Sequence, residues 1–221
     1  MKTALVTGDL GFIGQHLVRA LDEEYIVLGR DWKRGLSEDI RTCELPPADV
    51  CFHLAAQTKA QTKDAQEDAS INILGTLRIL ERYRKRVVFA ASATNPVVPY
   101  SISKHACEHY CQLYGARIVR MCNVTGPGGH GVIEAFDKAD VLKIAGKGDQ
   151  KREYASVERA VAMFLAAAKS PPGELHQLQG AELTVLEIAE LFYPTKRREF
   201  VEQDVNDVTD VGNMGSRSPR S

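Results

Sequence analysis

The first thirty residues combine a short apolar strand, three regularly spaced glycines and an amphipathic helix. Residues 3–7 form an apolar, β-branched run that is too short for a helix, which indicates a buried parallel strand. Gly8, Gly11 and Gly14 follow this strand, and the apolar positions after them recur with helical spacing. A second strand is predicted at residues 25–28. A strand, a glycine turn, a helix and a strand in this order begin a doubly wound α/β sheet.

The three glycines have separate physical roles. Gly8 permits the tight turn off the strand, Gly11 lets a pyrophosphate approach the backbone, and Gly14 lets the helix pack against the sheet. The helix start supplies amide groups and a partial positive charge to the phosphates. Because a strand precedes the turn and a helix follows it, we expect a dinucleotide-binding site here.

Strands and helices keep alternating after this unit. Residues 50–54, 87–90 and 117–120 are predicted as strands, with helical segments at 60–84 and 101–114. Five strands alternating with helices predict a mostly parallel sheet that is covered on both faces.

The character of the chain changes beyond Gly126. The later elements predicted are amphipathic helices at 132–145 and 157–169, a strand at 175–178, and a helix at 184–192 that Thr184 and Glu187 begin as a capping box. We predict a Rossmann dinucleotide-binding domain over 1–125, to which the strand at 175–178 returns, and a small, abbreviated C-terminal substrate lobe over 126–203. Residues 204–221 lose apolar periodicity and are expected to be mobile.

Composition excludes several classes of protein. With 28 Lys and Arg against 29 Asp and Glu, the net charge of −1 provides no positive field for nucleic acid or an anionic membrane. The apolar runs are too short for a signal segment or a membrane span, so we expect a soluble, cytoplasmic protein. Five scattered cysteines without a CxxC pair predict neither a disulfide framework nor a metal site.

Residues 7–14 read TGDLGFIG, which resembles the TGxxGFIG motif of the extended short-chain dehydrogenase/reductase family, the NAD(P)-dependent sugar epimerases and dehydratases. Further segments resemble that family in its order. They are Asp39-Ile40, His53 to Ala56, Asn72 to Thr76, Ala91 to Thr94, Tyr100 to Lys104 with Glu108 following, Arg120 to Pro127, and Gly148 to Tyr154. The resemblance covers residues 1–192 and implies NAD or NADP as cofactor and a nucleotide sugar as substrate.

The resemblance also implies a set of site residues. Ser92, Tyr100 and Lys104 would be catalytic, and Asn123 and Arg152 would bind substrate, the arginine at a phosphate. The residues expected to contact the cofactor, besides Tyr100 and Lys104, are Gly8, Gly11, Phe12, Ile13, Gly14, Arg30, Asp31, Asp39, Ile40, Leu54, Ala55, Ala56 and Asn72.

The end of the second strand bears on the choice of cofactor. NAD-using relatives place an Asp there for the adenosine ribose, whereas this chain has Gly29. Arg30 could pair with a 2′-phosphate, which favours NADP slightly. In the alternative, Arg30 is solvated and Asp31 holds the ribose.

Tyr100 and Lys104 are four residues apart at the start of a predicted helix, so both project from one face. The ammonium group and a positive nicotinamide would favour the phenolate, and Ser92 would hydrogen-bond the substrate oxygen. Dehydratases of the family place an acidic pair beside a catalytic Thr, whereas this chain continues Ser92-Ala93-Thr94-Asn95.

We therefore expect a 4-epimerase that acts through a transient 4-keto sugar. The alternatives are a 4-ketoreductase or 4-dehydrogenase, and a non-catalytic NAD(P)-binding regulator. Only seven residues separate Ser92 from Tyr100, about a third of the spacing usual in extended relatives. By family analogy, helices bearing residues 72–84 and 101–114 would form a homodimer interface.

Overall fold

The computed structural model describes residues 1–21, 24–58, 64–93 and 98–202. The helices and strands run, in chain order, as β1 (Lys2–Thr7), α1 (Phe12–Leu21), β2 (Tyr25–Arg30), β3 (Val50–His53), α2 (Ala65–Ala69), α3 (Gly75–Tyr83), β4 (Val87–Ser92), α4 (Pro99–Tyr114), β5 (Arg117–Met121), β6 (Asn123–Thr125), α5 (Val132–Lys138), β7 (Val141–Ala145), β8 (Lys151–Ser156), α6 (Val157–Lys169), β9 (Leu175–Leu178), β10 (Ala181–Thr184), α7 (Val185–Phe192) and β11 (Arg197–Val201). Short 3₁₀ turns lie at Trp32–Arg34, Leu36–Glu38 and Arg84–Arg86, and a π-helical segment, Ser70–Leu74, joins α2 to α3.

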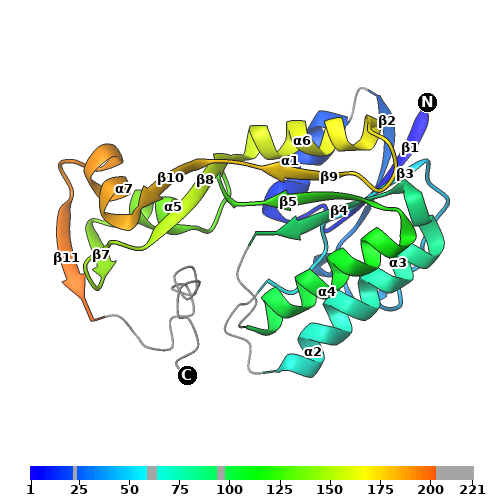
Figure 1. Ribbon diagram of the computed structural model, residues 1–221, viewed down its shortest axis with the longest axis horizontal. Coiled ribbons are helices and arrows are strands. Elements are labelled where there is room, and N and C mark those ends of the chain that lie inside the picture. Colours follow the sequence, from blue (N-terminus) through cyan, green and yellow to red (C-terminus); the bar gives the residue numbers. More distant parts are fainter. Residues whose placement is uncertain (22–23, 59–63, 94–97, 203–221) are drawn as a thin grey trace, which may run out of the picture. The chain divides into compact units, whose positions relative to one another are not determined.

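The chain forms two compact units, the first made of residues 1–121 and 157–178. Its centre is a six-stranded sheet in the order β2-β1-β3-β4-β5-β9 (Figure 1). Every neighbouring pair in this sheet is parallel. After β2 the chain crosses back over β1 to β3, so the strand order reverses there, and ligands of open α/β sheets bind at such a reversal. The predicted doubly wound Rossmann fold is confirmed.

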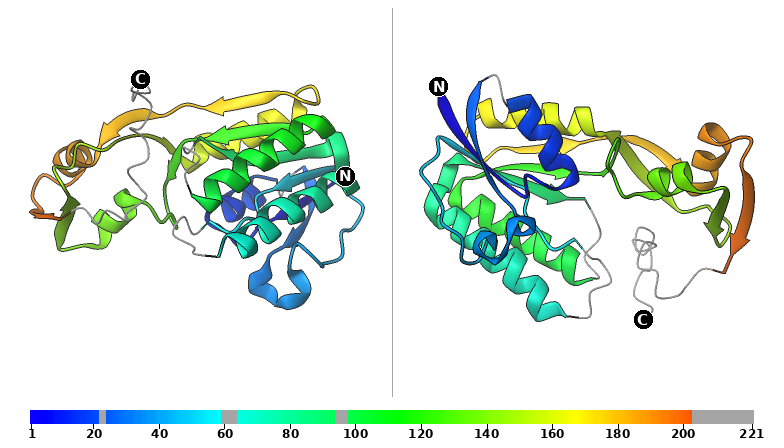
Figure 2. Two further views of the ribbon diagram at one scale, coloured as in Figure 1. Left: turned by 60° about the horizontal axis from the view of Figure 1, so that its bottom comes forward. Right: turned by 180° about the vertical axis from the view of Figure 1, so that it is seen from behind.

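Helices cover both faces of this sheet. In the views of Figure 2, α1 and α6 lie on one face, and α2, α3 and α4 lie on the other. The apolar runs read from the sequence are the buried strands: residues 87–91 of β4 are all buried. Fully burying a side chain the size of valine or phenylalanine contributes about 1.5–3 kcal/mol, so these strands fix the sheet.

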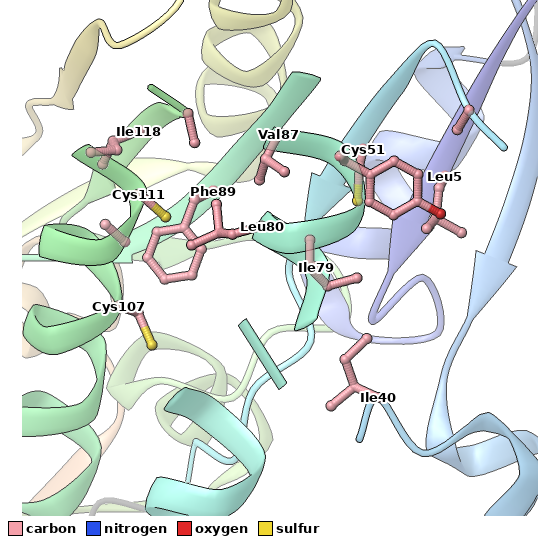
Figure 3. Packing of buried hydrophobic residues seen from close by; sticks show 14 of the residues in the cluster. Leu5, Ile40, Cys51, Ile79, Leu80, Val87, Phe89, Cys107, Cys111 and Ile118 are labelled. Atoms are coloured by element: carbon pink, nitrogen blue, oxygen red, sulfur yellow. The ribbon is translucent and has the colours of Figure 1, made fainter. Parts of the chain in front are cut away.

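The largest core cluster lies between the sheet and α3 and α4. Phe89 of β4 packs there with Ile79 and Leu80 of α3 and with Cys107 and Cys111 of α4 (Figure 3). Both cysteines are fully buried free thiols, and burial raises the pKa of each. Cys107 and Cys111 therefore act as small apolar residues of the core.

The second unit comprises residues 122–156 and 179–221, as far as these are described. It has a three-stranded sheet, β10-β8-β6, and a parallel pair, β11-β7. Its own apolar core is made of Phe136, Leu142, Ile144, Ile188 and Ala189.

This division differs from the expected one, in which the lobe runs over residues 126–203. Helix α6 belongs to the first unit together with β9, where it packs over the parallel sheet. The amphipathic spacing of residues 157–169 predicts the helix but does not say which sheet its apolar face covers.

The predicted helix over residues 132–145 is wrong in its second half. The helix ends at Lys138, and residues 141–145 are the strand β7. Leu142 and Ile144 alternate with more exposed neighbours and enter the core of the second unit. The apolar residues of this segment fit the period of two of a strand as well as the period of 3.6 of a helix. Pairing with β11 makes the segment a strand.

Other boundaries shift by smaller amounts. Helix α4 begins at Pro99 rather than at residue 101, with proline in the first turn, where its missing amide costs nothing. Thr184 caps α7 with Glu187 in a capping box, as predicted. The predicted mobility of residues 204–221 falls outside the described residues, as does most of the link between Ser92 and Tyr100.

Two findings concern the described ranges as a whole. None of their helices combines the length and the apolarity that crossing a bilayer requires. They also bring together no group of three or more His, Cys, Asp or Glu side chains suited to a metal ion.

Candidate active site

The glycine turn lies at the carboxyl end of β1, where the strand order reverses. Gly8 has φ +73°, which favours glycine, and a Cβ added to it would lie 2.8 Å from the backbone nitrogen of Ala55. A Cβ on Gly14 would lie 2.1 Å from the carbonyl oxygen of Gly8. These contacts leave no room for a side chain at Gly8 or Gly14, and α1 begins at Phe12.

This arrangement fits the pyrophosphate of a dinucleotide. The first amides of a helix have no acceptor within the helix, and the glycines of the turn add no side chain beside them. Gly11, Phe12, Ile13 and Gly14 all lie in this short segment, as the sequence analysis expects.

The loop after β3 lies directly against the glycine turn. The Leu54 amide donates to the carbonyl of Thr7, and the Ala55 amide donates to the Thr7 hydroxyl over 3.2 Å. Leu54, Ala55 and Ala56 are all partly buried. The two segments expected to contact cofactor from β1 and β3 are therefore brought together.

Asn72 lies in the π-helical segment and holds this loop in place. Its Oδ1 accepts from the Gln57 amide over 2.7 Å, and its Nδ2 donates to the Gln57 carbonyl and to the hydroxyl of Ser103 on α4. The side chain is buried. Asn72 thus positions the loop expected to bind cofactor, and Ser103, which the sequence analysis missed, completes the contact.

Asp39 and Ile40 have different environments. The guanidinium of Arg41 hydrogen-bonds the Asp39 carboxylate and holds its pKa below the usual range. Ile40 is buried in the core against Gly75 of α3, where a Cβ would lie 2.8 Å from Ile40 Cγ2. Gly75, within the family-like segment Asn72 to Thr76, therefore marks a close approach of α3 to the segment that carries Asp39 and Ile40.

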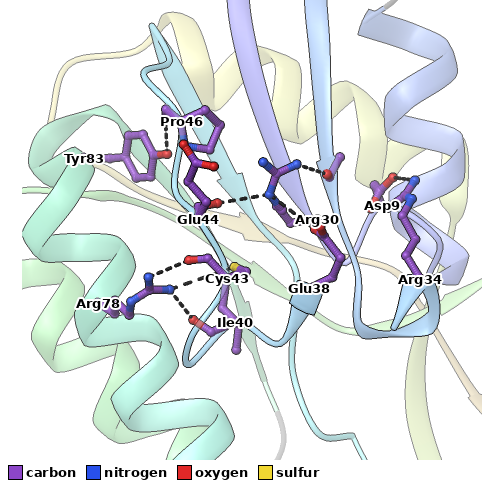
Figure 4. Close-up of polar contacts among 11 residues, drawn as sticks. Asp9, Arg30, Arg34, Glu38, Ile40, Cys43, Glu44, Pro46, Arg78 and Tyr83 are labelled. Carbon is purple, nitrogen blue, oxygen red and sulfur yellow. Dashed lines mark hydrogen bonds and ion pairs between the residues drawn. The ribbon is translucent and has the colours of Figure 1, made fainter. Parts of the chain in front are cut away.

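Arg30 ends β2 with its guanidinium engaged by protein groups. Its Nε lies 3.0 Å from the carbonyl of Glu44 and 3.3 Å from Glu38 Oε2 (Figure 4). The predicted preference for NADP rests on this side chain, and these contacts give that preference no support. Asp31 is buried, with Oδ2 accepting from the Leu10 amide over 3.2 Å and Oδ1 capping the turn that follows.

Ser92 ends β4 and Tyr100 lies in the first turn of α4, so the two ends come together. A side-chain hydrogen bond joins Ser92 to the Tyr100 phenol. Burial raises the pKa of Tyr100, and the hydrogen bond with Ser92 opposes that rise. The structure thus brings together the serine and the tyrosine that the sequence analysis predicts, across the short link between them.

Lys104 lies one helical turn after Tyr100 and is buried. Its Nζ lies 4.2 Å from the centre of the Phe89 ring, close enough for a cation–π contact. Burial lowers the pKa of Lys104. The sequence predicts that the lysine helps the tyrosine to ionise. In the structure, burial is the largest influence on the pKa of both groups and opposes both charged forms.

An ion pair fixes the rest of α4 to the sheet. Glu108 is buried, and the guanidinium of Arg120 on β5 donates to both of its carboxylate oxygens, with the Nε donating over 3.1 Å. Arg120 is the first residue of the family-like segment Arg120 to Pro127. This pair positions the helix that carries Tyr100 and Lys104.

Asn123 and Arg152, expected to bind substrate, lie in neighbouring strands of the second unit. Asn123 begins β6, and its Nδ2 donates to the carbonyl of Glu153 in β8 over 3.1 Å. Arg152 lies in β8, opposite Leu183 of β10. The sequence pattern does not predict β6, β8 or β10, and the pairing of β6 with β8 brings these two residues onto neighbouring strands.

This chain is similar in sequence and in fold to known proteins. Residues 4–178 match the model of the NAD dependent epimerase/dehydratase family. The UDP-glucose 4-epimerase of Mycolicibacterium smegmatis is 31% identical over 76% of this chain and 73% of its own length. A crystal structure of a UDP-galactose 4-epimerase is 28% identical, with a TM-score of 0.76 over 94% of this chain and 87% of that one.

A third protein, MoeE5 in complex with UDP-glucose and NAD, shares the fold with a TM-score of 0.81 and 23% identity over 93% of this chain and 87% of that one. The family match spans most of the chain and contains the glycine turn, Ser92, Tyr100 and Lys104. The chain belongs to the NAD-dependent epimerase/dehydratase family of the extended short-chain dehydrogenase/reductase type, and is an NAD-dependent sugar epimerase or oxidoreductase.

Proposed function

We propose that this chain is a nucleotide-sugar 4-epimerase that works through a transient 4-keto sugar. The observation that carries the proposal is the hydrogen-bonded pair of Ser92 and Tyr100, with the buried Lys104 one helical turn further along α4. The similarity to the UDP-glucose 4-epimerase of M. smegmatis and to the UDP-galactose 4-epimerase structure supports a UDP-hexose as substrate.

Tyr100 would transfer the proton of the C4 hydroxyl. Its phenolate would take that proton as the C4–H bond breaks, and the phenol so formed would give it back when the alcohol re-forms. NAD, held at the glycine turn of Gly8, Gly11 and Gly14, would supply reversible hydride transfer at C4. If the hydride returns to the opposite face of C4, the configuration is inverted, and neither substrate nor cofactor is oxidised overall.

Ser92 and Lys104 would support this proton transfer. The Ser92 hydroxyl, which is hydrogen-bonded to the phenol, would donate to the oxygen on C4 as the carbonyl forms. Lys104, one helical turn further along α4, would favour the phenolate when its amine is protonated, against the burial that lowers the pKa of Lys104. Because burial raises the pKa of Tyr100, we expect catalysis to increase with pH across the neutral range.

Asn123 and Arg152 would bind the nucleotide-sugar substrate. A guanidinium on a strand of the second unit can bind the phosphates with two parallel hydrogen bonds. Asn123, held by the Glu153 carbonyl, would present its amide to the same molecule.

The test uses a UDP-hexose labelled with deuterium at C4 and the purified full-length protein. The proposal expects the C4 epimer to form with deuterium retained at C4 and no net change in nicotinamide absorbance. Stoichiometric formation of NADH and release of a ketone would instead identify a dehydrogenase. If protein that holds NAD converts none of the UDP-, GDP-, dTDP- and CDP-sugars, the chain is a non-catalytic NAD-binding protein.

We also propose that the chain forms a homodimer through α3 and α4. Four large apolar side chains are exposed on α4 and on the π-helical segment next to α3: Leu74, Ile102, Tyr110 and Leu113. Pairing of these helices with those of a second copy would bury this surface and would fix the helix that carries Tyr100.

A further inference from the structure

We propose that the buried carboxylate of Asp68 is a positioning residue for the proton transfer at Tyr100. It would orient the amide of Asn72 and supply negative charge opposite Lys104. This role rests on the proposed function, and the experiment that tests it distinguishes its failure from failure of the epimerase reaction.

Asp68 lies on α2 and is only 1% exposed. An Asp side chain is almost never fully buried unless it is paired. Within the residues that the structure describes, no Lys, Arg or His side chain forms an ion pair with Asp68. Its Oδ2 accepts instead from the Nδ2 of Asn72 over 3.1 Å. A carboxylate buried in this way costs stability, and such groups cluster at functional sites.

Asn72 connects this carboxylate to the first turn of α4. The Ser103 hydroxyl donates to the Tyr100 carbonyl over 2.9 Å, so its oxygen accepts from Asn72 Nδ2, also over 2.9 Å. The same amide nitrogen lies 3.1 Å from the Gln57 carbonyl and 3.1 Å from the Asp68 carboxylate. Because an amide nitrogen has two hydrogens, these two acceptors share the second one. Asp68 therefore helps to fix the amide between the loop after β3 and the start of α4.

Helix α2 packs against α4, which places Asp68 near both proton-transfer groups. Burial raises the pKa of Tyr100, and the charge of Asp68 raises it further. Burial lowers the pKa of Lys104, and the charge of Asp68 opposes that change. A negative charge favours the protonated form of each group, so Asp68 keeps the Lys104 amine protonated and makes the Tyr100 phenol harder to ionise.

The thiols and the imidazole around Lys104 carry no charge at neutral pH. Cys107 and Cys111 lie on α4, and burial raises the pKa of both thiols. Their negative charge can therefore act on Lys104 only at higher pH. Burial lowers the pKa of His53 on β3 to about 3. None of these three groups balances the charge of Lys104 near pH 7.

Two carboxylates act on Lys104, and they differ in their own partners. Asp68 and Glu108 both favour the protonated amine, against the effect of burial. Arg120 donates to both oxygens of Glu108 and balances its charge locally. The side-chain partner of Asp68 is a neutral amide, so its charge is left to act on the amine.

These contacts predict how the rate depends on pH when Asp68 is neutral. The Tyr100 phenol should then ionise at lower pH, so the rate should begin to rise at lower pH. The Lys104 amine should also lose its proton at lower pH, so the rate should fall at lower pH as well. A residue that only packs would lower the rate and leave both limbs of the pH profile unmoved.

The test measures kcat/KM for conversion of a UDP-hexose to its C4 epimer from about pH 5.5 to about pH 10, with full-length protein saturated with NAD. Asp68→Asn keeps the shape and removes the charge, so both limbs should move down by about half a pH unit or more. Asp68→Glu keeps the charge and should leave the limbs near their wild-type positions, even if the rate falls. If Asp68→Asn does not fold, Asp68→Ser is also neutral and should move the limbs in the same direction.

Glu67→Gln is the matched control. It removes a carboxylate from the neighbouring position of α2, where the side chain is 47% exposed, and should keep the wild-type profile. A neutral Asp68 variant that folds, loses rate and keeps both limbs in place would overturn the inference. An equal shift in Glu67→Gln would also overturn it, because the effect would then not come from the buried carboxylate.

A second measurement needs no sugar substrate. Tyrosinate absorbance is titrated in NAD-loaded protein, and the Tyr100→Phe variant identifies the signal of Tyr100. This phenol should ionise at lower pH in Asp68→Asn than in the wild-type protein. If no sugar is converted, the proposed function fails while this titration still tests Asp68. An unmoved Tyr100 signal would contradict the role of Asp68 even in an active epimerase.

Discussion

His53 at the end of β3 is hydrogen-bonded to Thr7 at the end of β1, with Nδ1 2.7 Å from the threonine Oγ1. Its Nε2 lies 3.0 Å from the hydroxyl of Thr76 on α3. Burial, with a smaller contribution from the charge of Lys104, lowers the pKa of His53 to about 3. His53 therefore stays neutral in the folded protein and joins two strands and a helix beside the glycine turn.

The depressed pKa predicts acid sensitivity. The unfolded chain binds a proton at His53 below about pH 6.5, and the folded protein does not until about pH 3. Unfolding therefore takes up a proton, and this group lowers the free energy of unfolding by about 1.4 kcal/mol per pH unit as the pH falls through this window.

Urea unfolding between pH 4 and 7 checks this prediction. His53→Gln should reduce the slope of stability against pH by about one proton. His130 is an exposed loop residue, so His130→Gln serves as the control variant and should keep the wild-type slope. Equal slopes in wild type and His53→Gln would contradict the assignment.

The glycine turn predicts a difference between two Gly→Ala variants. Gly14→Ala places a Cβ 2.1 Å from the Gly8 carbonyl, so the backbone must shift, at a cost of about 3 kcal/mol and with loss of bound NAD. Gly115→Ala meets no atom within 4 Å and should cost about 1 kcal/mol, because its φ of +67° disfavours a side chain. Thermal melts and the NAD content of the purified variants measure both effects, and similar losses in the two variants would refute the prediction.

The contact between Glu108 and Arg120 predicts a further difference. Glu108→Gln removes a buried charge partner, so we expect a loss of about 2 kcal/mol in the free energy of unfolding. Glu182→Gln removes one partner of the exposed pair with Lys151 and should leave the free energy of unfolding unchanged. Urea titrations compare the two, and a Glu108→Gln protein as stable as wild type would show that the pair does not fix α4.

The exposed leucine on α4 tests the proposed dimer. Leu113 is 78% exposed, and Leu113→Glu should convert a dimer to a monomer, because a charge would be buried in the interface. Leu191 on α7 is 64% exposed, and Leu191→Glu is the matched control that should stay dimeric. Sedimentation at micromolar concentration distinguishes them. A monomeric wild-type protein, or a dimeric Leu113→Glu protein, would contradict the proposal.

The first unit could be predicted from the sequence because its strands are short apolar runs bounded by glycine and polar turns. Buried parallel strands such as 87–91 leave this signal, and the ordered family motifs added Ser92, Tyr100 and Lys104. The second unit could not be predicted as well. Its strands are partly exposed, and the pairing that turns residues 141–145 into a strand comes from residues 197–201, far along the chain.

In the site, too, the sequence predicts local features but not contacts between side chains that are distant along the chain. The spacing of Gly8, Gly11 and Gly14 predicts a backbone turn, since each glycine has a local reason to be there. The contact of Asp9 with Arg34 depends on where the 31–34 segment folds back, and no local pattern gives it. The same holds for Arg30, whose engagement by Glu38 no strand pattern predicts.

Tyr100→Phe tests the central claim most directly. The variant keeps the ring and loses the hydroxyl that is hydrogen-bonded to Ser92. We expect the conversion of a UDP-hexose to its C4 epimer to fall by about 10²- to 10⁴-fold, the usual contribution of a positioned proton-transfer group, with NAD content and melting temperature unchanged. A Tyr100→Phe protein that binds NAD and epimerises at the wild-type rate would contradict the account.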